Sequence, residues 1–228
     1  MPSAPAPTSD CDACDQPGWY AEAALLYMTS YSGNNLLLGG LGGGNGYDGD
    51  WDLGARVAVG NELPDGLFYE VSGFWYEGDF SVDTEPGELE VYYIDAIIGD
   101  NLHCGEACLD YGFGLRYADA EVTIDGDSGG FDGIGPVLEL SGKRPLTEQL
   151  GVYAEMRQAI LFGDLDFDGT SVDTVASVTE LGGGVEFFFN AGPVQNAWAR
   201  LGVEGQYWAV DDLTIGLVGG VLKVGFNF

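Results

Sequence analysis

The sequence predicts an all-β fold: a transmembrane, antiparallel, up-and-down β-barrel of about ten strands with both termini in the periplasm. Apolar and polar residues alternate with a period of two in ten successive segments, the pattern of strands with two different faces. No stretch approaches about 18 consecutive apolar residues, so no transmembrane helix is predicted. The last segment alternates up to its final residue, Phe228, and a terminal aromatic residue is typical of outer-membrane barrels. An even strand number returns the chain to the side on which it started.

The length of 228 residues suits one domain. Residues 1–17, rich in Pro, Ala, Ser and Asp, are expected to form a flexible N-terminal segment, and residues 18–228 to form the barrel. The first ten residues lack the basic and apolar regions of an export signal. We therefore expect that the signal is absent or already removed, and that the protein resides in a bacterial outer membrane.

The ten predicted strands and their connections alternate along the chain. The strands are expected at residues 18–30, 51–60, 67–77, 89–98, 108–119, 133–141, 150–162, 174–189, 197–209 and 213–228. The connections 31–50, 78–88, 120–132 and 163–173 are long and rich in Asp and Gly, whereas 210–212 is short. The intervening connections 61–66, 99–107, 142–149 and 190–196 are compact and contain turn formers. Long loops on one side and short turns on the other are typical of outer-membrane barrels.

The two faces of each segment differ in composition. In segment 51–60, Trp51, Leu53 and Val57 share one face, while Gly54 and Arg56 share the other. A face of glycine, alanine and isolated charges suits a crowded barrel interior. Aromatic residues near the segment ends suit the girdles at the two membrane interfaces, and they are Trp19, Tyr27, Trp51, Trp75, Tyr92, Tyr117, Phe187, Phe189 and Tyr207. The alternative is a soluble barrel similar to a lipocalin, with its apolar face inward.

Most of the basic residues are predicted to face the interior, together with many acids. Fifteen charged residues share this face: Glu22, Asp52, Arg56, Glu70, Asp95, Asp110, Arg116, Glu139, Glu155, Arg157, Glu180, Glu186, Arg200, Glu204 and Lys223. Charges in a low-dielectric wall require partners or water. One interpretation is a porin-like protein whose narrow, cation-preferring pore passes ions or small polar solutes and is lined by these residues. The other is a structural or adhesive barrel with a charge-plugged lumen and acidic loops that bind cations or a partner.

The charge balance and the chemistry of the loops restrict the partners. A formal net charge of −30 excludes nucleic acid. The expected partners are outer-membrane lipid and the barrel insertion machinery acting through Phe226 and Phe228. The apolar stretch 36–38 is expected either to fold into the barrel mouth or to meet a neighbouring envelope protein. The only histidine, His103, falls in a predicted periplasmic turn, so we expect no enzyme site. No cofactor is expected beyond weakly bound divalent cations.

Cysteine and aspartate spacings give two further predictions. Cys11, Cys14, Cys104 and Cys108 form two close pairs, which favours disulfides in an oxidising compartment and leaves the pairing open. A four-thiolate zinc site is the alternative. Three aspartates are spaced as at the start of an EF-hand loop, but Val175 stands where the bidentate glutamate belongs. The sequence therefore predicts no firm metal site and only a weak candidate at Asp164, Asp166 and Asp168.

Four strings add a resemblance. Residues 51–56 (WDLGAR), 114–118 (GLRYA), 131–136 (FDGIGP) and 202–208 (GVEGQYW) look like the planctomycete-type and Legionella-type pore-forming outer-membrane protein family in order and spacing. The resemblance implies a pore-forming outer-membrane barrel and no enzymatic site. The acidity, the cysteine pairs and the glycine-rich stretch 39–46 depart from it.

Overall fold

The computed structural model describes residues 17–32, 48–82, 85–104, 107–167, 169–191, 194–211 and 213–228. They form ten strands: β1 (Gly18–Ser32), β2 (Asp48–Glu62), β3 (Phe68–Val82), β4 (Glu85–Cys104), β5 (Ala107–Ile124), β6 (Asp127–Pro145), β7 (Leu150–Phe167), β8 (Thr170–Ala191), β9 (Val194–Val210) and β10 (Leu213–Asn227). Within these ranges, no helix is long and apolar enough to cross a membrane.

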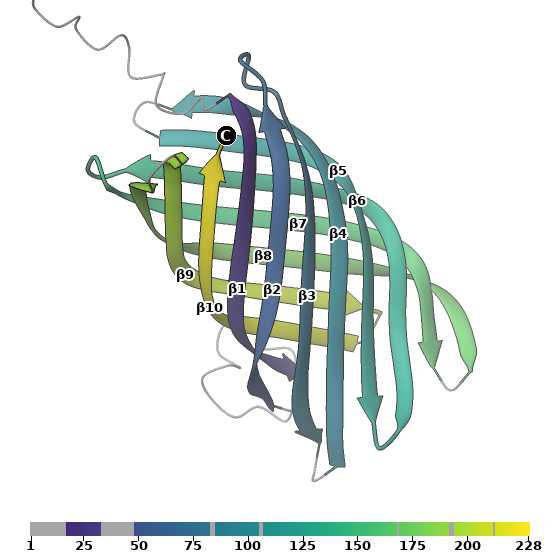
Figure 1. The fold of residues 1–228 in the computed structure, drawn as a ribbon. Helices are drawn as coiled ribbons and strands as arrows, with labels where there is room; N and C mark the ends of the chain where they lie inside the picture. The colour runs from purple at the N-terminus through teal and green to yellow at the C-terminus, as the bar shows by residue number, and fades with distance from the viewer. Residues whose placement is uncertain are drawn as a thin grey trace, which may run out of the picture.

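The strands close into one antiparallel barrel in which each pairs with its sequence neighbours and β1 pairs with β10. Figure 1 shows the start of β1 beside the C-terminus, at one end of the barrel. There the backbone nitrogen of Phe228 donates to the carbonyl of Trp19 at 2.8 Å, and the nitrogen of Trp19 donates to the carbonyl of Phe228 at 3.1 Å. We call this end the terminal end and the opposite end the hairpin end. The predicted ten-strand barrel is confirmed.

The apolar face of every strand points outward. Val57, Leu201 and Val203 are 60%, 58% and 67% exposed, and similar residues occur on all ten strands. So large an apolar surface is stable only when lipid covers it. Aromatic pairs flank this belt, with Trp19 and Tyr69 near the terminal end and Tyr27 and Trp51 nearer the hairpin end. The chain is therefore a transmembrane barrel, and the alternative of a soluble lipocalin-like barrel is wrong.

The prediction of long loops at the hairpin end is largely wrong. Residues 120–132 form a hairpin in which β5 and β6 are joined by Asp125 and Gly126 alone. Both have positive φ, 52° and 88°, as a tight two-residue turn between twisted strands requires. The expected loops 78–88 and 163–173 likewise belong mostly to strands. Aspartate and glycine have low strand propensity, which is why these segments resemble loops in sequence, but here the hydrogen-bonded ladder continues through them.

Candidate functional site

The fifteen predicted interior charges occur on inward positions of the strands, but they do not form one continuous lining. Seven of them are buried: Arg56, Asp95, Arg116, Glu180, Glu186, Glu204 and Lys223. The others are partly exposed. Asp52 lies apart from the rest, because its carboxylate accepts a hydrogen bond from the backbone nitrogen of Asp79 at 3.1 Å, where the β2–β3 register is interrupted. The remaining charges separate into a buried layer and an open cavity.

The buried layer bridges opposite walls of the barrel. Arg56 on β2 donates to both carboxylate oxygens of Glu204 on β9, at 2.9 and 2.6 Å. It also donates to Glu180 on β8, at 2.9 Å. The hydroxyl of Tyr93 accepts from Arg56 at 2.7 Å and donates to Glu180 at 2.6 Å. Arg56 is only 2% exposed, so its guanidinium fills the lumen at this level.

Arg116 completes the layer from the other side. It forms a bidentate pair with Asp95 on the adjacent strand, with both hydrogen bonds at 2.7 Å, and an ion pair with Glu180. Its guanidinium carbon lies 3.7 Å from the centre of the Tyr93 ring, a cation–π contact. Both Arg116 and Asp95 are 0% exposed. Arg56, Tyr93, Asp95, Arg116, Glu180 and Glu204 are hereafter the charged layer.

On the hairpin side of the charged layer the lumen is filled by apolar side chains. Leu26, Met28, Leu161, Val178 and Leu217 are fully buried there, and Phe80 and Phe131 pack against the same cluster. Trp208, 1% exposed, links this cluster to the layer, because its indole nitrogen donates to Gln206 at 3.3 Å and Gln206 donates to Glu204 at 3.3 Å. The lumen is therefore blocked by a polar layer and an apolar plug in series.

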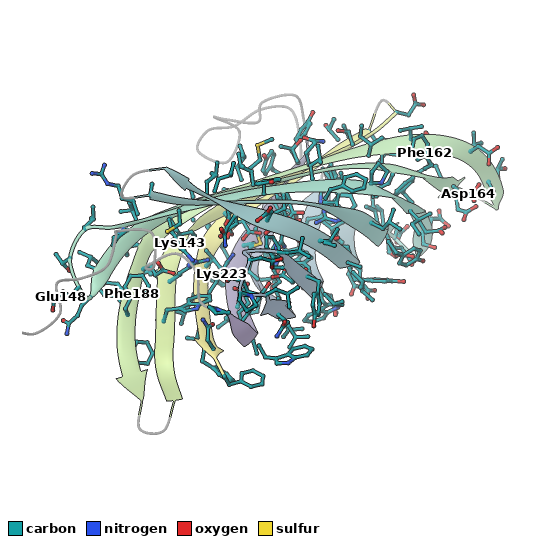
Figure 2. All side chains as sticks on the ribbon, turned by 90° about the horizontal axis from the view of Figure 1, so that it is seen from above. Lys143, Glu148, Phe162, Asp164, Phe188 and Lys223 are labelled. Atoms are coloured by element: carbon teal, nitrogen blue, oxygen red, sulfur yellow. The ribbon has the colours of Figure 1, made fainter. Side chains whose placement is uncertain are left out.

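On the terminal side of the charged layer lies an open cavity, which we call the cup. Its volume is about 940 Å³. Figure 2 shows Lys143, Glu148 and Phe188, three of its lining residues, toward one end of the barrel, with Phe162 and Asp164 toward the other. Eight carboxylates line the cup against three basic side chains; the acids are Glu22, Glu62, Glu70, Asp110, Glu139, Glu148, Glu155 and Glu186, and the bases are Lys143, Arg157 and Arg200.

Ion pairs organise the inner part of the cup. Arg157 donates to Glu139 at 2.7 Å and to Glu70 at 3.4 Å, and Glu70 also accepts from the Tyr20 hydroxyl at 2.9 Å. Lys223, on β10, pairs with Glu155, on β7. Arg200 pairs with Glu186 at 2.8 Å. Nearer the mouth, Ser141 donates to Asp110 at 3.3 Å.

Outside the barrel, acidic residues form rows beyond the lipid-facing belt at the hairpin end. Asp119, Asp132, Asp164 and Asp173 stand directly opposite one another across β5, β6, β7 and β8. A second row joins Glu77, Glu90 and Glu121 across β3, β4 and β5. None of the seven Lys and Arg residues of the chain lies near these rows, because all seven are in the lumen or at the terminal end. Like charges directly opposite one another destabilise a sheet, so counterions would stabilise these rows.

The metal and cysteine predictions fare differently. Asp164 and Asp166 lie in β7 rather than in a loop, and Asp168 is outside the described residues. Among the described residues, no three His, Cys, Asp or Glu side chains could hold a metal ion together. Cys108 is buried and lines the cup. Cys11, Cys14 and the side chain of Cys104 lie outside the described part, so the disulfide pairing stays a prediction.

Sequence reasoning missed the neutral members of the buried network, Tyr93, Gln206 and Trp208. Each occupies an inward position of a predicted strand, but the candidate site residues were identified by their charge, and these three side chains are uncharged. A signal was nevertheless present, because Arg56, Arg116, Gln206 and Trp208 lie in three of the four strings noted above. These strings therefore converge on the charged layer and its apolar neighbour.

The fold and the blocked lumen define a transmembrane barrel with an acidic exterior at one end and a cup at the other. No protein-family model matches the chain, and no curated protein matches it. Its structure is similar to the translocator domain of the autotransporter NalP from Neisseria meningitidis, with 13% identity, a TM-score of 0.53, and coverage of 96% of this chain and 92% of that one. It is also similar to the outer membrane protease OmpT from Escherichia coli, with 11% identity, a TM-score of 0.56, and coverage of 92% and 97%. At such identities the likeness shows the fold alone.

Proposed function

We propose that this protein is a structural barrel of the bacterial outer membrane whose lumen is closed, with its terminal end in the periplasm and its hairpin end outside the cell. The observation that carries the proposal is Arg56, which reaches from β2 to Glu180 and Glu204 on the opposite wall and is 2% exposed. An ion or sugar passing through would have to separate these buried ion pairs and then cross the apolar plug. Both steps are strongly unfavourable.

The acidic rows at the hairpin end would serve in adhesion and in cation binding. The rows of directly opposed carboxylates bring negative charge to the hairpin end without any basic residue nearby. Divalent cations would lower this repulsion and bridge the barrel to other anionic groups of the envelope, such as phosphorylated lipid headgroups or an acidic neighbouring protein. Since no complete ligand set is present in the described residues, the cations would be held weakly.

A second candidate is the narrow, cation-preferring passage. The excess of carboxylates in the cup favours it, because rings of acids attract cations. This function requires a state in which the charged layer and the plug move aside. Membership of the pore-forming family suggested by the four strings belongs to this candidate.

Planar-bilayer recording of detergent-purified protein decides between the two. The closed barrel predicts no discrete conductance from preparations whose folded state is verified by heat-modifiable gel migration. The matched measurement is uptake of small sugars by protein-containing vesicles, with an open porin as the positive control. Discrete, cation-selective currents from the wild-type protein would contradict the closed barrel and favour the cation-preferring passage.

We add proposals for the C-terminal strand, for Cys108 and for enzymatic activity. Insertion machinery would recognise the C-terminal strand, on which Phe226 and Phe228 point outward at 40% and 69% exposure. Cys108 would be held in a disulfide that fastens the mouth of the cup, and peptide mapping without reduction would identify its partner. The likeness to an outer membrane protease extends to the fold, and we propose no enzymatic activity.

A further inference from the structure

The cup is closed at its inner end and open at the terminal end. Its inner lining residues Glu155 and Arg157 lie close to the charged layer, whose Arg56 and Glu204 are each 2% exposed, so we take this layer as its floor. Its walls include Tyr20 near the start of β1 and Asn227 near the end of β10, and the turn with Glu148 lies at its mouth. A molecule that enters from this side therefore stops in the cup. A volume of about 940 Å³ is within the range of sites for small organic ligands.

The wall of the cup carries uncompensated negative charge. Five of its eight carboxylates lie in the inner part, where the basic partners are Arg157, Arg200 and Lys223. Glu70, Glu139, Glu155 and Glu186 use these three cations. Glu22 makes no hydrogen bond or close ion pair with any residue in the described ranges, and it interacts with Arg200, the ion-pair partner of Glu186, only at longer range. A cation that enters the cup would therefore meet a carboxylate that makes no hydrogen bond to the described part of the protein.

The cup also has aromatic walls. Phe68, Phe188 and Trp198 line it together with the carboxylates. Aromatic faces and carboxylates together suit an organic ammonium ion, whose methylene groups pack on rings while its nitrogens donate to acids. A bare metal ion would make no use of the rings. More than one ammonium group is favoured because the carboxylates are spread from the mouth, at Glu148, to the inner wall, at Glu22.

We propose that the cup binds a linear organic polyamine from the periplasmic side. This inference rests on the proposed function for two points, the closed floor and the periplasmic orientation of the terminal end. The ligand class follows from the cup itself: a net acidic, dead-end cavity with an unpaired carboxylate and aromatic walls.

The test is isothermal titration calorimetry of the detergent-folded, full-length protein with spermidine. We expect saturable binding whose affinity falls as NaCl is raised, because the recognition is largely electrostatic. Glu22→Gln should weaken binding by about three- to tenfold, while leaving no basic side chain without its partner. Glu90→Gln is the matched control: it removes the same charge from the acidic row at the hairpin end, so it reports spermidine held there as a surface counterion, and it should leave the affinity of the saturable site unchanged.

A second readout locates the ligand. Trp198 lines the cup, whereas Trp208 is buried beyond the floor and Trp19, Trp51 and Trp75 face outward. Spermidine should therefore change the tryptophan emission of the wild type and not that of Trp198→Phe. Equal weakening by Glu22→Gln and Glu90→Gln would show that spermidine acts only as a counterion of the surface and would overturn the inference, as would the absence of binding. Those outcomes would not affect the proposal that the lumen is closed. Discrete conductance in planar bilayers, by contrast, would contradict the closed lumen itself.

Discussion

Arg56 and Glu204 face each other across the lumen and are joined by two hydrogen bonds, at 2.9 and 2.6 Å, with both side chains 2% exposed. They are separated by 148 residues along the chain and come from β2 and β9. A pair so far apart in sequence forms only when the barrel has closed. It therefore ties the two halves of the wall together as well as filling the lumen.

Removing one partner of this pair should be strongly destabilising. Arg56→Ala leaves Glu204 and Glu180 buried with less compensating charge, and we expect a loss of about 3–5 kcal/mol in the free energy of unfolding. Urea titration in lipid vesicles, followed by tryptophan emission, measures this. The control is Arg56→Met combined with Glu204→Leu, which replaces the pair with apolar side chains and should recover part of the loss. A single variant as stable as the wild type would contradict a buried pair.

The acidic rows should make stability depend on divalent cations. Asp132 stands between Asp119 and Asp164, so Asp132→Asn relieves two direct repulsions. We expect the variant to be more stable than the wild type by about 0.5–1 kcal/mol at low ionic strength. The difference should shrink when millimolar MgCl₂ is added. Asp65→Asn, in the turn between β2 and β3 at the terminal end, is the control and should show neither effect.

The same rows predict a dependence on pH. Asp164 lies beyond the lipid-facing belt, where partial desolvation and the facing carboxylate of Asp173 raise its pKa above the ordinary value. A carboxyl whose pKa is raised by folding binds its proton more tightly in the native state, so stability should increase as the pH falls through the raised pKa. Unfolding measured between about pH 7 and pH 4 should show this rise. Asp164→Asn should reduce this rise in stability. The same rise in the variant as in the wild type would show that the raised pKa of Asp164 does not contribute to stability.

The Asp125–Gly126 turn gives a prediction about backbone strain. Gly126 has φ of 88° and no heavy atom within 4 Å of the position that a Cβ would take. Gly126→Ala should therefore be destabilising by about 1 kcal/mol for conformational reasons alone. Gly142→Ala is the matched control, since its added Cβ would make only ordinary contacts, at 3.7 Å and beyond, and φ is not positive there. Equal stabilities of the two variants would show that the turn tolerates a side chain.

The sequence predicts the strand number and the inward and outward faces well, because both follow from strict alternation. Segment 51–60 lies within β2, and Val57 and Arg56 point to the two faces expected. The strand ends are predicted poorly at the hairpin end, where Asp164 and Asp166 continue β7 although their composition is that of a loop. Local propensity there is overridden by pairing with the neighbouring strands, which a single segment does not reveal.

For the site, the sequence identifies which charges face inward but not which of them meet. Whether Arg116 contacts Asp95, its direct neighbour on β4, follows from register alone. Whether Arg56 reaches Glu180 depends on the barrel's diameter and on the strands that happen to face each other across the lumen. The distinction between a passage and a plug lies in these contacts across the lumen, and that is why the sequence left both interpretations open.

The separation of charge along the barrel also bears on how the protein enters its membrane. In the proposed orientation the outward acids at the hairpin end cross the hydrocarbon during assembly, and a charge on the lipid face of a barrel costs up to about 2–4 kcal/mol at the bilayer midplane, less for Asp and Glu than for Lys and Arg. Once they have crossed and become hydrated, reversal would require moving all of them back through the same barrier. The acidic hairpins would then impose a kinetic barrier to leaving the membrane, so that insertion is effectively irreversible and the orientation of the barrel stays fixed for the lifetime of the molecule.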